Sequence, residues 1–170
     1  EKAAVSTFQS AYNTTNGMVR NNIDPFFSDP DARIPGLRLD GKGFTSALNN
    51  ERVVYQTLLT SWQQKSNTIS TAADINTELA YASVQVQRTI TLIDTFLTVF
   101  ANQDRNGRYS ESEIKGFINS FTSLRSTLIG TQSSIDNAEN SLSSAREGVE
   151  KAKIAASGGT TSAADAQIKQ

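Results

Sequence analysis

The chain has 170 residues, of which 37% are hydrophobic, and this length suits one domain with a modest apolar core. Its 16 basic and 17 acidic residues leave a net charge of −1, so charge gives no support to nucleic-acid binding. The absence of Cys excludes disulfides and thiol chemistry, and the absence of His removes the commonest general base and metal ligand.

The first predicted helix runs over about Lys2–Phe26. All three prolines of the chain lie between Pro25 and Pro35, and Pro25 disfavours helical geometry at Asp24. We therefore expect a helix followed by a loop that continues to about Thr45. Apolar or small residues recur in this helix at steps of three and four, which is the period of an amphipathic helix: Ala4, Phe8, Ala11, Thr15, Val19 or Met18, Ile23 and Phe26.

Two further helices are predicted, over about Ser46–Ile69 and Ile75–Asn102. The last turns of the third helix are apolar almost all round, so we expect them to be buried on several sides. The apolar stripe of the second helix consists of Leu48, Val54 or Tyr55, Leu58, Leu59 and Trp62. The stripe of the third consists of Leu79, Ala82, Val86, Ile90, Ile93, Leu97 and Phe100.

The fourth segment carries the longest pattern. From Ile114 to Ala152, over 39 residues, apolar residues alternate at steps of three and four, which indicates a long left-handed packing seam. Phe and Leu in its first half favour a multi-helix core, and Ala in its second half favours a close contact between two helices. Gly158 and Gly159 are expected to end this helix in a turn, and Ser162 to cap a further helix. We therefore divide the chain into a helical bundle and hairpin domain (1–157) and a turn with the start of a truncated further helix (158–170).

Four helices with one apolar stripe each predict an all-α fold, an antiparallel four-helix bundle. In it the long fourth helix forms a coiled-coil hairpin extension with the first helix. If these two helices are antiparallel neighbours, Ala4, Phe8 and Ala11 meet the Ala-rich half of the fourth helix, and both ends of the chain lie at the same end of the molecule. Neither end resembles a natural terminus, so we interpret the chain as a domain excised from a larger protein. No apolar run approaches the roughly 20 residues that span a bilayer, so we expect no direct membrane insertion.

The loop NQDRNGRYSESE fits the twelve-position calcium loop of an EF-hand at most positions. Gly107 stands at the turn position, Tyr109 at the apolar position, and predicted helices flank the loop on both sides. Asn replaces the expected Asp at the first position, so affinity is expected to be weak. The predicted ligands of one Ca²⁺ are Asn102, Asp104, Asn106, Arg108 (through its carbonyl), Ser110 and Glu113.

The same loop has a second interpretation without metal. Ser110 can cap the fourth helix, and Glu113 can complete a capping box. A lone EF-hand loop, with no second one to pair with, favours a structural role for the ion over a sensing role.

Other constellations favour structure over chemistry. Asp24, Asp29 and Asp31 offer carboxylates for a cation, but they are expected to cap or solvate turns, while Phe26 and Phe27 close one end of the bundle. Trp62 with Tyr55 suits a ligand platform, although an aromatic pair at helical spacing is typical of a core. The Gly-rich run LRLDGKGF lacks the spacing of a phosphate loop. No base accompanies a nucleophile, so the chain is expected not to be an enzyme.

Four runs carry a resemblance to a known family: VRNNIDPFFSDP (Val19–Pro30), ERVVYQTLLTSW (Glu51–Trp62), YSESEIKGFINSFTSLRSTL (Tyr109–Leu128) and the stretch from Ser133 to Gln170. Together they resemble the enlarged helical hairpin of bacterial membrane fusion proteins, the periplasmic adaptors of the haemolysin-D type. The resemblance implies a protein that is anchored at a membrane, oligomerises around a conduit and extends a helical hairpin toward other subunits of a transport assembly. The lipoyl-like and β-barrel domains of that family are not in this chain.

The expected function is therefore that of a spacer and docking element in an export or efflux assembly, in the periplasm or outside the cell. Two alternatives stay open. One is a calcium-binding extracellular helical module for binding or adhesion, and the other is a helical-bundle sensor domain of a membrane receptor.

Overall fold

The computed structural model describes residues 1–40, 43–70, 74–103 and 107–168, with side chains as far as Ser157. This part of the chain is all-helical and contains α1 (Lys2–Met18), α2 (Thr45–Thr68), α3 (Ile75–Ala101) and α4 (Glu111–Ile168). Short π-helical (Val19–Ile23) and 3-10 (Asp24–Phe26) segments continue α1. The four predicted helices are confirmed, and the starts and ends of α2 and α3 agree with the prediction to within one residue.

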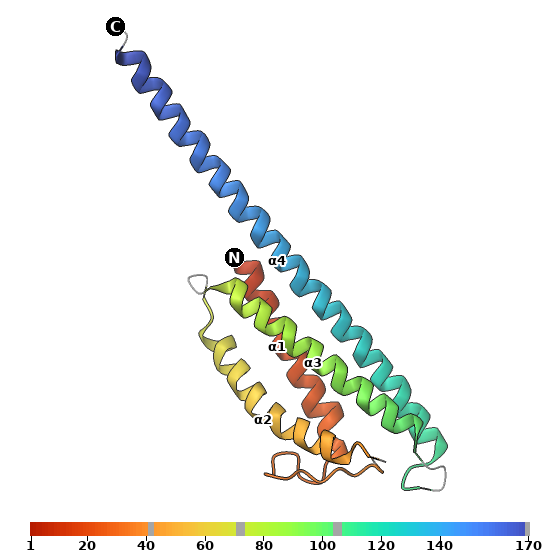
Figure 1. Cartoon of the computed structure of the whole chain (residues 1–170). Coiled ribbons are helices and arrows are strands. Elements are labelled where there is room, and N and C mark those ends of the chain that lie inside the picture. Colours follow the sequence, from red (N-terminus) through yellow and green to blue (C-terminus); the bar gives the residue numbers. More distant parts are fainter. Residues whose placement is uncertain (41–42, 71–73, 104–106, 169–170) are drawn as a thin grey trace.

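Helices α1 and α3 lie between α2 and α4 (Figure 1). Each of them contacts both outer helices, and they also contact one another. Helix α4 passes beside α1 and α3 and then extends well beyond them, so that the C-terminus lies at its far tip and the N-terminus beside its middle (Figure 1). Residues 27–40, the end of α3 and the start of α4 lie at the opposite end, where Gln103 Nε2 donates to the carbonyl of Asp40 at 2.7 Å.

The predicted stripes of the first three helices form the core. In α2 the choice between the two candidates is settled, because Tyr55 is fully buried whereas Val54 is 39% exposed. Phe26 and Phe27 are both buried. Phe26 lies at the centre of a ring cluster with centroid distances of 5.0 to 5.8 Å: Phe96, Phe100, Phe117 and Phe121.

The first helix runs to Phe26 as predicted, although Pro25 disfavours helical geometry at Asp24. Asp24 has φ −54° and ψ −35°, and the chain stays helical to Phe26 by changing its hydrogen-bond pattern from α to π and then to 3-10. The helix ends at Phe27, which is extended, and Phe27 forms a single antiparallel bridge with Leu37. The Asp24 side chain accepts hydrogen bonds from Arg20 of the π-helical segment at 3.2 Å and from Arg52 of α2 at 2.6 and 3.1 Å.

The turn predicted at Gly158 and Gly159 is wrong, because α4 continues through both glycines to Ile168. A helical glycine costs about 1 kcal/mol relative to Ala, but it keeps its backbone hydrogen bonds and does not by itself end a helix.

Candidate functional site

The seam of α4 is covered along only part of its length. Phe121, Leu128, Ile135 and Leu142 are buried, which confirms the predicted pattern up to this point. From Ser143 to Ser157 every residue of α4 is exposed. The same heptad positions continue there with Ala145, Val149 and Ala152, which we call the distal α4 face. Val149 is 55% exposed, so this part of the seam lacks a partner among the described residues.

A cavity of about 730 Å³ lies where the distal α4 face meets the start of α1. Leu142, Ala145 and Val149 give it an apolar floor, and charges of both signs surround that floor. Its charged lining residues are Glu1, Lys2, Arg146, Glu150 and Lys153. A hydrophobic floor with a polar rim is the usual anatomy of a protein-binding surface.

Small side chains line the groove between α1 and α4. Ala4 shares a hollow of about 340 Å³ with Ala138 and Leu142, and Ala11 lies further along beside Thr131. The first turns of α1 thus lie against the Ala-rich part of α4, as expected from their sequences. Most side chains in this groove are small, which lets the two backbones approach closely.

Helix α3 fixes the register of α4 on its other side. Arg125 Nε donates to Asp94 Oδ1 at 2.7 Å, and Gln132 Nε2 donates to Ser83 Oγ at 2.7 Å. These contacts hold the buried half of α4 in place, and the distal α4 face projects from that base.

The α3–α4 connection begins α4 with the predicted capping box. The backbone N–H and the hydroxyl of Ser110 both donate to Glu113 Oε2, at 2.8 and 2.7 Å. In return, the N–H of Glu113 donates to Ser110 Oγ at 3.3 Å. These hydrogen bonds to Ser110 hold the pKa of the Glu113 carboxyl below its usual value.

The structure places four of the six predicted calcium ligands. Ser110 and Glu113 contact one another, whereas Asn102 Nδ2 donates back to the carbonyl of Thr98 at 2.8 Å. The Arg108 guanidinium lies over the ring of Tyr109 at 6.0 Å from its centroid. The remaining two predicted ligands, Asp104 and Asn106, lie outside the described residues. Ser110 and Glu113 thus form a helix cap, whereas Asn102 and Arg108 make other contacts, and the calcium site stays a prediction.

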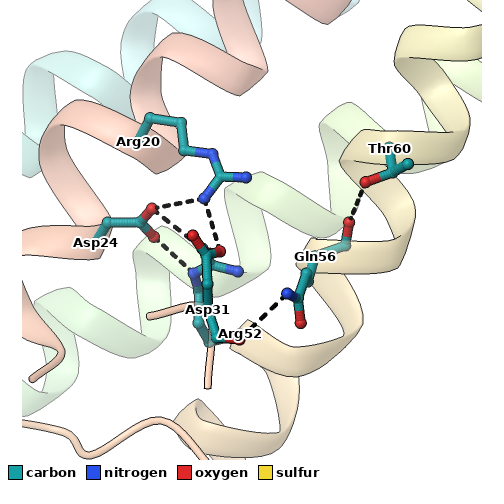
Figure 2. A network of polar contacts seen from close by, with 6 residues as sticks. All are labelled: Arg20, Asp24, Asp31, Arg52, Gln56 and Thr60. Atoms are coloured by element: carbon teal, nitrogen blue, oxygen red, sulfur yellow. Dashed lines mark hydrogen bonds and ion pairs between the residues drawn. The ribbon is translucent and has the colours of Figure 1, made fainter. Parts of the chain in front are cut away.

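An ion cluster that the sequence did not predict joins the π-helical and 3-10 segments after α1, the loop that follows them, and α2 (Figure 2). Arg52 of α2 is 1% exposed and binds the nearly buried carboxylate of Asp24 at 2.6 and 3.1 Å. Asp31 Oδ1 accepts from Arg20 at 2.9 Å and from Arg52 at 3.1 Å. The backbone carbonyl of Asp31 also accepts from Gln56 Nε2 at 3.2 Å, so α2 holds the loop by its main chain as well.

The contact between Arg20 and Asp31 favours the charged form of both side chains. Hydrogen bonding to Arg20 lowers the pKa of Asp31 and, reciprocally, raises that of Arg20. The expected role of Asp24 and Asp31 in capping or solvating turns is therefore wrong, because their carboxylates pair with arginines. Arg52 lies four residues after Leu48 and three before Tyr55, so its core-facing position was visible in the helical spacing.

The aromatic pair singled out as a ligand platform belongs to the core. Trp62 is fully buried among the rings of Phe8, Tyr12 and Tyr81, with centroid distances of 5.9 to 6.1 Å. The Tyr55 hydroxyl donates to Thr89 Oγ1 at 2.8 Å, and burial raises its pKa.

Comparison with protein-family models, with curated proteins and with solved structures finds no match to this chain. Among the helices of the described ranges, none combines the length and the apolar character needed to cross a membrane. Among the described residues, the distal α4 face and the cavity beside the start of α1 are the candidate functional site.

Proposed function

We propose that the chain is the non-enzymatic helical hairpin domain of a membrane-fusion-type adaptor in an export or efflux assembly. It acts there as a spacer and docking element. The observation that carries this proposal is the projection of α4: its heptad seam continues past Leu142 with Ala145, Val149 and Ala152, where α1 no longer covers it.

In this proposal the helices form an antiparallel four-helix bundle, and α1 and α4 form the coiled-coil hairpin. Two observations support that arrangement. Ala4, at the start of α1, lies in one hollow with Ala138 and Leu142 of α4. Phe26, at the end of the 3-10 segment that continues α1, contacts the rings of Phe117 and Phe121, which come earlier in α4.

The proposed partners are other protein subunits of the assembly and further copies of the adaptor, in the periplasm or outside the cell. Membrane anchoring is assigned to parts of the adaptor other than these helices. The apolar floor and charged rim beside α1 support a protein partner over a nucleic acid, because the basic residues there alternate with Glu1 and Glu150.

A thiol-accessibility experiment tests the docking role. Because the native chain has no Cys, only the introduced thiol of each variant can be labelled. Val149→Cys is placed on the distal α4 face, and the matched control Ile154→Cys is placed on an exposed position outside the seam. We expect maleimide to label both thiols in the purified chain. In the intact cell envelope of the organism that makes the protein, we expect it to label only the control thiol. Equal labelling of both positions in the envelope would rule out docking through this face.

The second candidate function is a calcium-stabilised extracellular helical module, and the ligand spacing of Asn102–Glu113 supports it. An ion bound there would stabilise the fold by mass action. We expect the melting temperature to be higher in millimolar calcium than with chelator, and Glu113→Gln, which keeps the cap acceptor, to abolish that difference. A melting temperature that calcium leaves unchanged in the unsubstituted protein would remove this candidate.

A further inference from the structure

No further inference is drawn: the strongest candidate, the exposed distal α4 face of Ala145, Val149 and Ala152, belongs to the site already described, and nothing in the described residues shows what covers it.

Discussion

Arg52 of α2 contacts both Asp24, which follows α1, and Asp31 of the loop. A buried ion pair contributes little net stability compared with an apolar pair, but removal of one partner leaves an uncompensated charge in the interior. Through Asp31, the cluster therefore specifies where the loop after Phe27 lies more than it stabilises the fold.

We expect Arg52→Met to lower the free energy of unfolding by about 3 kcal/mol, because Asp24 would stay buried with only Arg20 to pair with. Adding Asp24→Asn should restore part of that loss, because it removes the unpaired charge. Urea denaturation at neutral pH measures both changes. Arg33→Ala, at an exposed position of the same loop, is the control and should alter stability by less than about 0.5 kcal/mol. A single Arg52→Met substitution without effect would contradict the importance of the cluster.

Asp31 should give the protein an acid-sensitive component of stability. Its folded pKa lies below the ordinary value of 3.8, mainly because of the hydrogen bond from Arg20. The unfolded chain therefore binds this proton first, so the contribution is complete above about pH 3.8 and is lost as the pH falls through the folded pKa.

Asp31→Asn should reduce the loss of unfolding free energy at acid pH. Asp29→Asn, which leaves the cluster intact, should not change it. Equilibrium unfolding between pH 2 and pH 6 (an interval chosen to bracket the ordinary carboxyl pKa of about 4) compares the slopes. If unfolding free energy falls with pH at the same slope in the unsubstituted protein and in Asp31→Asn, the contact between Asp31 and Arg20 does not contribute to stability.

At the scale of elements, the start of α4 depends on its capping box. Ser110→Ala removes the side-chain partner of the Glu113 N–H and one donor to its carboxylate. We expect a loss of about 1 kcal/mol in unfolding free energy, which is the usual cost of losing a helix N-cap. Ser126→Ala, on the exposed face of the same helix, provides the comparison, and an equal loss in both variants would argue against a specific cap.

The elements were predictable to the extent that local pattern decides them. The three- and four-residue steps located every helix, and the S-x-x-E spacing located the cap. The contact of Arg52 with Asp24 and Asp31 was not predictable, because those residues are 28 and 21 positions away in the sequence and no periodicity links a loop carboxylate to a helix. The turn at Gly158 was predicted from propensity alone, and α4 continued because two glycines lower helix stability without blocking it.

At the scale of the whole molecule, α4 has one sequence pattern and two environments. Leu142 is 4% exposed and Val149 is 55% exposed, although both occupy the same seam. The heptad pattern predicted that a helix would cover this seam, but sequence alone could not say where α1 would stop covering it. The position of the candidate site therefore follows from where α1 begins beside α4, which only the structure shows.

Truncation at the two positions should separate these environments. We expect Leu142→Ala to lower the unfolding free energy by about 2 to 3 kcal/mol and Val149→Ala to change it by less than about 0.5 kcal/mol in the isolated chain. Thermal or urea unfolding followed by circular dichroism measures both. A large loss from Val149→Ala would mean that the chain already buries this residue, for example by self-association, and sedimentation would then identify the partner copy.

The part of α4 that projects beyond α1 and α3 can act as a lever arm. From Leu142 to Ile168 the helix rises about 40 Å at 1.5 Å per residue, without support from the other described helices. With that arm, a tilt of about 10° at the base would carry the tip sideways by roughly 7 Å. A protein bound at the tip would therefore load the packing of α4 against α1 and α3, including the hydrogen bonds that Arg125 and Gln132 make with α3.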